Sequence, residues 1–449
     1  MARPSRAQAL SVWANGQRVG SWRIPPRGPM ELQYDEEWMR SNLGRPLSLS
    51  LPFGVDASTP LRGERVQNYF DNLLPDSEAI RRRMAARFKT QSLEPFDLLA
   101  AVGRDCVGAI QLLDEDAPVP RIDVTEGTAL NDEDIEELLK RALAPASLRQ
   151  ATMDEDDQDD FRISLAGAQE KWALLRHEGR WLRPHGATPT THILKLPLGL
   201  VGNSRVDLST SVENEWLCLS ILRAYGLPVA ECEMHSFGKQ KALVVSRFDR
   251  QIDAQGTWYL RLPQEDFCQA TGRSPLMKYE ADGGPALAEL ANLLKQSVQP
   301  GDDLRTLFAA QILFWMLCAP DGHAKNFSIH LLAQGRYRLT PLYDVMSILP
   351  AAGQGPNQFN WHRAKLAMAV SGKNRHYLIK DIQRRHFNAM AQSILGVSAE
   401  PLIQDLLART PAVIEQMYAS LPDGYPARVA EAILEGLRAA AQRLEVMPV

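Results

Sequence analysis

Apolar and polar positions alternate in short runs along residues 1–115, the pattern of strands that bury one face. Residues 10–13 and 18–24 flank Asn15 and Gly16, a pair that favours a tight hairpin turn. Residues 66–74 and 78–89 instead space their apolar side chains at helical intervals and contain good helix formers. We therefore predict an α+β domain over residues 1–115.

The next segment, residues 116–160, is rich in acidic side chains and ends in a run of aspartates and glutamates at positions 154–160. Like charges in such a run repel one another and favour solvation over packing. We interpret residues 116–160 as an acidic linker region rather than as a metal site.

The rest of the chain changes from strand-like to helical patterning. Strand-like runs dominate residues 161–265, with one helical interruption over residues 212–225 that Gly226 closes. Helical spacing then recurs at residues 285–295, 304–318, 386–395, 401–408, 411–420 and 428–445. These patterns predict a β-rich lobe over 161–265 and a mostly helical lobe over 266–449. A nucleotide held between two lobes is one use of such an arrangement.

The composition is that of a globular protein, because 45% of the 449 residues are hydrophobic and 23% are charged. The formal net charge of −4 argues against a surface built as a whole to hold nucleic acid or an anionic membrane. Five dispersed cysteines without a C-x-x-C pair favour reduced thiols, and no apolar run is long enough to suggest a membrane span. We therefore expect a cytoplasmic protein.

The strongest candidate chemistry follows the apolar stretch 304–318. Asp321 and Asn326 lie five positions apart on the next loop, the spacing of the catalytic aspartate and metal-binding asparagine in protein kinases. Residues 327–332 and 336–342 then predict a hairpin that returns Asp344 beside this loop. A carboxylate and a carboxamide supply the hard oxygen ligands of Mg²⁺. The alternative is that Asp321 caps a turn and Asp344 simply ends a strand.

Lys195 lies within an apolar strand, where a half-buried ammonium needs a partner or a ligand. Glu215 follows on the predicted helix, and a strand lysine steadied by a helix glutamate is the device by which kinases hold nucleotide phosphates. Glu213 is an alternative partner, and a lysine that extends to solvent at a sheet edge is the alternative to a site.

Three further groups depend on this interpretation. Small residues in the loop 164–171 allow backbone N–H groups to approach phosphates, although the loop lacks the P-loop motif. Residues 262–267 join the lobes and offer backbone hydrogen bonds to an adenine edge. His323 and Lys325 flank the proposed base and are assigned an accessory role in anchoring the transferred phosphate. A further group, Arg247, Asp249 and Arg250, is interpreted as a surface charge cluster.

Taken together, these strings resemble the HipA-type serine/threonine kinases, the toxins of a bacterial type II toxin–antitoxin system. The likeness rests on FRISLAGAQEK (161–171), THILKLP (191–197), RLPQED (261–266), DGHAKNF (321–327) and LYD (342–344). In the first domain it rests on PLSLSLP (46–52), FDNLLPD (70–76) and VGRD (102–105). The resemblance implies a protein-kinase-like, two-lobed α+β fold with an accessory amino-terminal domain.

The resemblance also implies residue roles. Asp321 would be the catalytic aspartate, Asn326 and Asp344 would hold Mg²⁺, and Lys195 would bind the phosphates of ATP. Ser164 matches the family's autophosphorylated serine, whose modification expels the nucleotide loop. The loop that covers the nucleotide would comprise Leu165, Ala166, Gly167, Ala168, Gln169, Glu170 and Lys171, and the adenine hinge would comprise Gln264, Glu265, Asp266 and Phe267.

The resemblance implies partners as well. The target would be an aminoacyl-tRNA synthetase, typically glutamyl-tRNA synthetase, whose phosphorylation halts translation and leads to growth arrest and persistence. A small dimeric helix-turn-helix antitoxin of the HipB type would neutralise the toxin and make most of the contact with operator DNA. Two other functions stay open: a small-molecule kinase, and a non-catalytic ATP-binding corepressor that acts through an antitoxin on DNA.

The sequence departs from familiar kinase patterns at three places. Ala319 and Pro320 replace the His-Arg pair that precedes the catalytic aspartate of ordinary protein kinases, so the arginine that reads a phosphorylated activation loop is absent. Val345 follows Asp344 where those kinases have phenylalanine. Within the HipA pattern, Trp172 is bulkier than the threonine expected there, so it is expected to alter packing beside the nucleotide loop.

Overall fold

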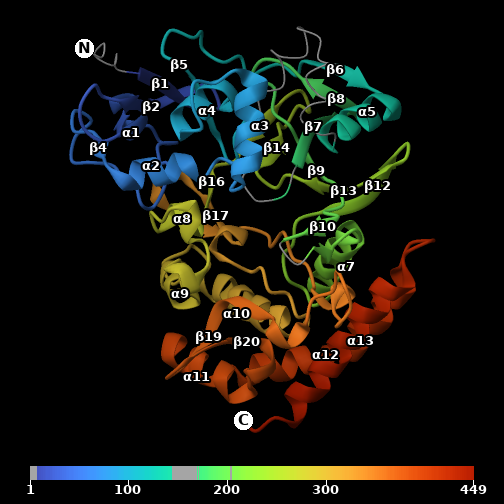
Figure 1. The fold of residues 1–449 in the computed structure, drawn as a ribbon. Coiled ribbons are helices and arrows are strands. Elements are labelled where there is room, and N and C mark those ends of the chain that lie inside the picture. Colours follow the sequence, from blue (N-terminus) through green and yellow to red (C-terminus); the bar gives the residue numbers. More distant parts are fainter. Residues whose placement is uncertain (1–7, 144–168, 170, 203–204) are drawn as a thin grey trace.

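The computed structural model describes residues 8–143, 169, 171–202 and 205–449, and Figure 1 shows their arrangement. The amino-terminal domain contains a five-stranded sheet in the order β4-β3-β2-β1-β5. Its strands are β1 (Gln8–Ala14), β2 (Gln17–Ile24), β3 (Glu31–Tyr34), β4 (Leu61–Arg62) and β5 (Ile110–Asp114). Its helices are α1 (Glu36–Arg40), α2 (Glu64–Asp71), α3 (Glu78–Phe88) and α4 (Pro95–Val102).

The hairpin predicted at the start of this domain is confirmed. β1 and β2 pair antiparallel across Asn15 and Gly16, whose φ angles of 47° and 75° are those of a tight turn with two left-handed positions. Trp22 of β2 stacks on Phe70 of α2 with ring centroids 3.9 Å apart, so the sheet and the helices share one buried core.

A second, six-stranded sheet forms the β-rich lobe in the order β12-β13-β9-β7-β8-β6. The helix predicted over residues 212–225 is present as α7 (Ser211–Ala224), which packs on β12 and β13. The strands of this sheet are β6 (Gly127–Leu130), β7 (Lys171–His177), β8 (Arg180–Pro184), β9 (His192–Lys195), β12 (Cys232–Phe237) and β13 (Gln240–Ser246). Two short ladders accompany it: β10 (Leu200–Val201) with β11 (Val206–Asp207), and β14 (Arg250–Ile252) with β15 (Tyr259–Arg261).

The segment interpreted as an acidic linker is structured in part. β6 pairs with β8, and α5 (Asp132–Leu143) packs against β12 and β13. Ile135 and Leu139, spaced one helical turn apart among acidic neighbours, are fully buried in the core of the lobe. Their burial holds α5 on the sheet, whereas the acidic run at 154–160 lies outside the described residues.

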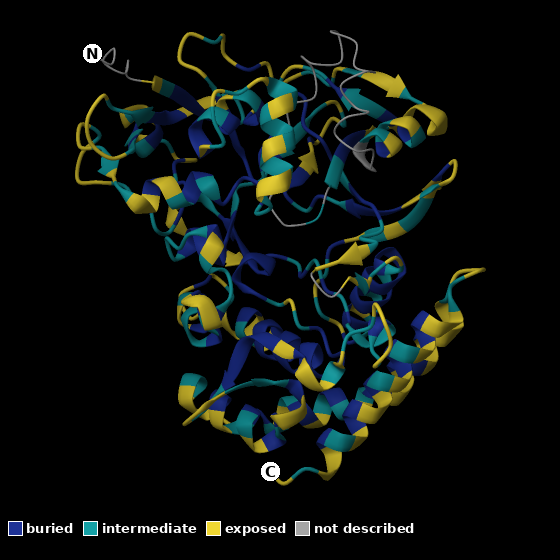
Figure 2. Ribbon diagram, viewed as in Figure 1, coloured by how far each residue is buried: buried dark blue, intermediate teal, exposed yellow. Residues whose placement is uncertain are grey.

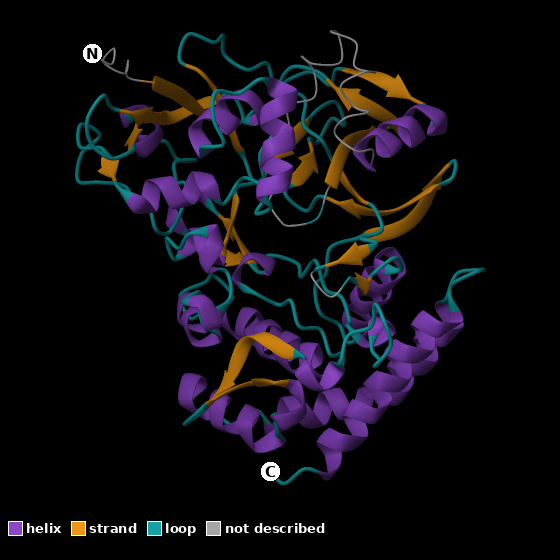
Figure 3. Cartoon of the chain, viewed as in Figure 1, coloured by secondary structure: helices purple, strands orange, loops and turns teal. Residues whose placement is uncertain are grey.

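The carboxy-terminal lobe is mainly helical, and Figure 3 shows its helices gathered below the two sheets. The α10 helix is buried along most of its length (Figure 2). The helices are α8 (Phe267–Ala270), α9 (Leu287–Leu294), α10 (Pro300–Met316), α11 (Arg384–Leu395), α12 (Glu400–Ser420) and α13 (Ala427–Val446). The strands are β16 (Gln264–Asp266), β17 (Ser328–Leu331), β18 (Tyr337–Leu339), β19 (Lys365–Ser371) and β20 (Arg375–Leu378).

One predicted break in this lobe is wrong. The two helices expected at 401–408 and 411–420 are one helix, α12, which continues through Pro411. A proline inside a helix removes one backbone hydrogen bond. Packing offsets that loss, because α12 contacts both α7 and α13, and Thr410 hydrogen-bonds Tyr225 of the chain segment after α7.

The amino-terminal domain joins the β-rich lobe through a buried ionic cluster, which corrects the surface cluster expected from the sequence. Arg247, Asp249 and Arg250 are buried, and both arginines reach Asp105 of the amino-terminal domain. Arg261 adds a third contact to Asp105 at 3.2 Å. These arginines can be buried because Asp105, from the amino-terminal domain, pairs with their charges.

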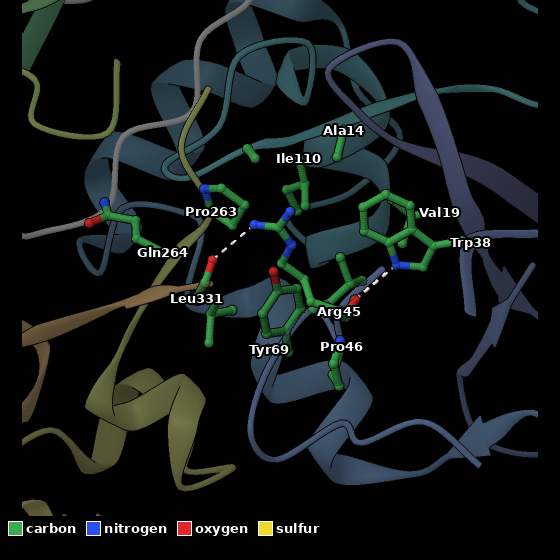
Figure 4. Close-up of a pocket in the computed structure, with 12 residues that line it drawn as sticks. Ala14, Val19, Trp38, Arg45, Pro46, Tyr69, Ile110, Pro263, Gln264 and Leu331 are labelled. Carbon is green, nitrogen blue, oxygen red and sulfur yellow. Dashed lines mark hydrogen bonds between the residues drawn. The ribbon is translucent and has the colours of Figure 1, made fainter. Parts of the chain in front are cut away.

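Two smaller features complete this junction. Figure 4 shows a small cavity between the amino-terminal domain and the segment that joins the lobes, in which the Arg45 guanidinium donates to the carbonyl of Leu331 at 3.1 Å. Its volume of about 20 Å³ has room for a water molecule and for little more. Farther along the junction, Arg87 of α3 lies 5.6 Å from the ring of Trp172, so this tryptophan packs against the amino-terminal domain.

Candidate active site

The loop that carries Asp321 is fixed by the buried helix before it and by its own hydrogen bonds. The Asp321 carbonyl accepts from the backbone N–H of His323 and from Asn326 Nδ2, both at 2.8 Å. This arrangement uses the amide nitrogen of Asn326 as a donor, and its carboxamide oxygen is the atom that could bind a cation. A Cβ atom at Gly322 would lie 2.5 Å from the Phe314 ring, so the tight loop requires glycine.

Asp344 follows the predicted hairpin in the chain. β17 and β18 pair antiparallel, and the chain then reaches Asp344, whose φ of 59° is rare outside glycine. The preceding Tyr343 donates its hydroxyl to the carbonyl of Lys325 at 2.8 Å and lies 2.6 Å from Ser328 Oγ. Tyr343 therefore links the segment of Asp344 to the loop of Asp321 and Asn326, a role that sequence reasoning missed.

Lys195 connects the two lobes. It lies at the end of β9, and its ammonium binds Glu215 Oε1 of α7 at 2.6 Å and Asp344 Oδ1 at 2.8 Å. The alternative partner, Glu213, is engaged by Lys241 instead. The structure therefore selects Glu215, as expected, and brings Lys195 and Asp344 together although they are 149 residues apart in the chain.

The charges at this centre are coupled. Burial lowers the pKa of Lys195, but the charges of Asp344 and Glu215 outweigh it and raise the pKa above its ordinary value. Burial raises the pKa of Asp344, but Lys195 and Lys171 outweigh it and hold the pKa below its usual range. Glu215 is more deeply buried, and this burial raises its pKa. At neutral pH, Lys195 and Asp344 are therefore both ionised.

The predicted nucleotide loop is described at only two positions. Gln169 donates its amide to the carbonyl of Leu196 at 2.7 Å. Lys171 begins β7 directly opposite Lys195, so the two ammonium-bearing side chains belong to neighbouring positions of one sheet. Ser164, Leu165, Ala166, Gly167, Ala168 and Glu170 lie outside the described residues, and their roles stay predictions.

The segment expected to be the hinge does join the lobes. Gln264, Glu265 and Asp266 form β16, which pairs with β17 and leads into Phe267 at the start of α8. The Glu265 side chain accepts from the backbone N–H of Leu49 in the amino-terminal domain at 2.8 Å. The acidic side chains of this segment therefore serve the fold, and its role as an adenine hinge stays a prediction.

Burial raises the pKa of Glu265 to about 8 from the usual 4.5. The folded protein thus holds a proton that the unfolded chain releases, and stability falls as pH rises between these two values. Glu265→Gln keeps the hydrogen-bond acceptor and removes the ionisation. We expect the variant to unfold at a higher temperature than the wild type above about pH 8, and at a similar temperature near pH 5. Thermal unfolding across this range measures the difference, and a pH-independent offset would contradict the assignment.

The two accessory candidates differ. His323 lies 4.0 Å from Asp321 Oδ1, and burial lowers the pKa of its imidazole, which keeps it neutral. Lys325 has a different geometry from the one expected of a phosphate anchor. Its ammonium binds Asp266 Oδ2 at 2.8 Å and both the carbonyl and the side-chain oxygen of Asn72, which uses all three of its donors. Lys325 therefore joins the hinge to the amino-terminal domain.

Sequence reasoning also missed Tyr279. Its hydroxyl donates to Asp321 Oδ1 at 2.6 Å, and its ring packs edge-on against His323 with centroids 5.1 Å apart. Asp321 itself is half exposed, with 49% of its side chain accessible. One carboxylate oxygen is thus held by the protein while the group stays open to solvent, as a base that receives a proton from a bound molecule requires.

The donor set fits Mg²⁺. The structure offers an ionised carboxylate at Asp344 and a carboxamide oxygen at Asn326, both hard oxygen ligands. Within the described part of the chain, no group of three or more His, Cys, Asp or Glu side chains could hold a metal ion. A cation at this site would therefore take its remaining ligands from phosphates and water, as in nucleotide-dependent kinases.

Comparison with known proteins identifies the family. Residues 163–421 match the HipA-like C-terminal domain, and residues 10–113 match the HipA N-terminal domain. The chain belongs to the HipA family of toxin kinases. A relative from Sinorhizobium fredii, named "Putative kinase Y4mE", is 35% identical over 347 residues, which cover 76% of this chain and 77% of the relative.

Two further comparisons extend this result. The serine/threonine-protein kinase toxin HipA of Shewanella oneidensis is 26% identical over 354 residues, covering 76% of this chain and 73% of that protein. A solved structure of Shewanella oneidensis HipA with HipB and operator DNA has a TM-score of 0.77 at 22% identity and covers 97% of both chains. The HipA fold is thus shared along nearly the whole chain. Among the described residues, no helix has the length and apolar character needed to cross a membrane.

Proposed function

We propose that this HipA-family protein is an ATP-dependent serine/threonine-protein kinase whose toxicity comes from phosphorylating a cytosolic protein. The observation that carries the proposal is the contact of Lys195 with both Glu215 and Asp344. In protein kinases, the corresponding lysine–glutamate pair and the metal-binding aspartate must both be in place for phosphate transfer. This arrangement supports a kinase that is already assembled for catalysis.

Each group then has a chemical task. The substrate hydroxyl oxygen forms a bond to the γ-phosphorus of ATP, the bond from that phosphorus to the bridging oxygen breaks, and ADP leaves. Asp321 orients the hydroxyl and accepts its proton, while Lys195 holds the phosphates. When bound at Asn326 and Asp344, Mg²⁺ neutralises charge on the phosphates. The backbone of residues 264–267 receives the adenine edge.

The family supplies the partners of the proposal. We infer a HipB-like helix-turn-helix antitoxin that neutralises the kinase, because the Shewanella oneidensis relative was solved with HipB and operator DNA. A net charge of −4 supports DNA contact mainly through that antitoxin. The protein substrate is an aminoacyl-tRNA synthetase, such as glutamyl-tRNA synthetase. Autophosphorylation of Ser164 inactivates the enzyme, because a dianionic phosphate placed beside the carboxylates of Asp321 and Asp344 would be repelled from the site.

Labelled ATP added to the purified protein with a cytosolic lysate tests this function. We expect label on an aminoacyl-tRNA synthetase and on Ser164, identified by mass spectrometry of the phosphorylated peptides. Omission of Mg²⁺ should abolish both signals. Label on a small metabolite alone would replace the proposal with a small-molecule kinase, and ATP binding without any transfer would replace it with a corepressor.

A further inference from the structure

A short segment of the amino-terminal domain, Asn72 to Asp76, reaches the loops around Asp321. It follows α2 directly and belongs to the sequence string that carries the family resemblance in this domain. Asn72 is buried, and its amide donates to the carbonyls of Asn68 and Arg273. The segment is therefore fixed both within its own domain and against the helical lobe.

One contact of this segment leads to Asn326. Lys325 Nζ donates to the Asn72 side-chain oxygen at 2.7 Å and to the Asn72 carbonyl at 3.1 Å, across 253 residues of chain. The adjacent Asn326 donates to the carbonyl of Asp321 at 2.8 Å. Asn72 thus fixes the part of the loop that holds the Asp321 backbone and the proposed metal ligand.

The second contact leads to the Asp321 carboxylate. Asp76 Oδ2 binds Lys278 Nζ at 2.9 Å, and both side chains are largely buried. The adjacent Tyr279 donates its hydroxyl to Asp321 Oδ1 at 2.6 Å, while the Lys278 carbonyl accepts from the backbone N–H of Ala324 at 3.3 Å. Asp76 thus fixes Lys278, and the adjacent Tyr279 holds Asp321, the proposed base.

The charge of Asp76 attracts Lys278 and Lys325 to this segment. Burial raises the pKa of Asp76, but the charges of Lys325 and Lys278 outweigh it and lower the pKa below its usual range. The carboxylate is therefore ionised at neutral pH and attracts both lysines. Burial and the neighbouring Asp321 raise the pKa of Tyr279, so its hydroxyl retains the proton that it donates.

We infer that Asn72 and Asp76 are positioning residues of the kinase, through which the amino-terminal domain holds Asp321 from two sides: Asn72 through Lys325 and Asn326, and Asp76 through Lys278 and Tyr279. This inference rests on the proposed function, since it assigns these residues to the same phosphate transfer. It gives the amino-terminal domain a direct part in catalysis. Seating of that domain on the helical lobe then sets the rate of transfer.

Asp76→Asn in the full-length protein tests the inference. The variant loses the charge that holds Lys278, so Tyr279 no longer fixes Asp321, and we expect kcat to fall about tenfold or more. The KM for ATP should stay within about twofold, because Lys195 and Asp344 are untouched. Asp71→Asn is the matched control, since Asp71 forms an ion pair of similar burial with Arg81 inside the amino-terminal domain. The control should retain wild-type kcat even where its melting temperature falls.

A double-mutant cycle separates positioning from general loss of stability. If Asp76 acts through Lys278, then Lys278→Gln and the double variant with Asp76→Asn should show the same reduced kcat as Asp76→Asn alone. Additive losses in the cycle would overturn the inference. So would a wild-type kcat in a folded Asp76→Asn protein.

Hydrogen–deuterium exchange supplies a measurement that needs no catalysis. We expect Asp76→Asn to speed exchange of amides in residues 276–282 and 319–327, and Asp71→Asn to leave them unchanged. A wild-type protein that transfers no phosphate would defeat the proposed function, and the exchange experiment would still decide whether this segment holds the Asp321 loop. Unchanged exchange in both segments would overturn the inference by itself. If Asp76→Asn does not fold, Lys278→Gln serves as the variant in the same measurement.

Discussion

Asp321→Asn is expected to lower phosphate transfer by about three orders of magnitude while leaving the fold and the affinity for ATP close to those of the wild type. The amide keeps an oxygen that can accept from Tyr279, which bonds Asp321 at 2.6 Å, so the loop keeps its conformation. It cannot accept the proton of a substrate hydroxyl. The loss should therefore be in kcat, which initial rates of label transfer measure, with ATP affinity measured separately by calorimetry.

The control for this variant is Asp282→Asn, which removes an exposed carboxylate close to Tyr279 in the sequence. It should transfer phosphate at the wild-type rate. Equal activity of wild type and a folded Asp321→Asn protein would remove Asp321 from the role of base. A loss of ATP affinity of the same size as the loss of kcat would instead indicate that Asp321 holds the nucleotide complex.

The centre of the site could be predicted because its residues lie in short strings with fixed spacing. Asp321 and Asn326 share one loop, and the hairpin after them returns Asp344 by local pairing alone. The choice between Glu213 and Glu215 could not be made from the sequence, because both lie in the first turns of α7 and only the packing of that helix on the sheet decides which faces Lys195.

The residues that sequence reasoning missed are ordinary polar residues whose partners lie elsewhere in the chain. Asn72 and Asp76 contact Lys325 and Lys278, which lie 253 and 202 residues away in the helical lobe. Tyr279 and Tyr343 contact Asp321 and Lys325 within the helical lobe itself, across 42 and 18 residues. The buried contacts of Lys325 were missed for the same reason. Because Lys325 lies close to Asp321 in the sequence, it was expected to anchor the transferred phosphate. Its buried partners, Asn72 and Asp266, lie 253 and 59 residues away in the chain.

Predictions made from local composition were wrong where contacts between distant segments determine whether a residue is buried. The acidic character of residues 116–160 concealed α5, in which Ile135 and Leu139 are the fully buried apolar side chains among those described. The burial of Arg247 and Arg250 could not be predicted from local composition either. Charged side chains are seldom fully buried without partners, and the partner here, Asp105, lies in the other domain. The sequence around Asp105 gives no sign of its contact with these arginines.

Asp105→Asn should be the most destabilising of these variants, with a loss of about 3–5 kcal/mol in the free energy of unfolding. The carboxylate lies among three buried arginines, with Arg250 at 2.8 Å, Arg261 at 3.2 Å and Arg247 at 3.3 Å, and it also accepts from Thr190. Removing its charge leaves Asp249 as the acidic member of the described cluster. Urea unfolding at neutral pH measures the loss.

The pH dependence of that loss identifies its cause. Burial raises the pKa of Asp105, but the three arginines outweigh it and hold the pKa far below its usual range. The stabilisation is therefore complete above the unfolded value of about 3.8 and declines as pH falls below it. The difference in the free energy of unfolding between wild type and Asp105→Asn should therefore become smaller at acidic pH. Glu36→Gln, which breaks an exposed ion pair with Arg40, should cost less than about 1 kcal/mol at any pH. A gap that stays constant down to about pH 2 would indicate lost packing rather than lost charge.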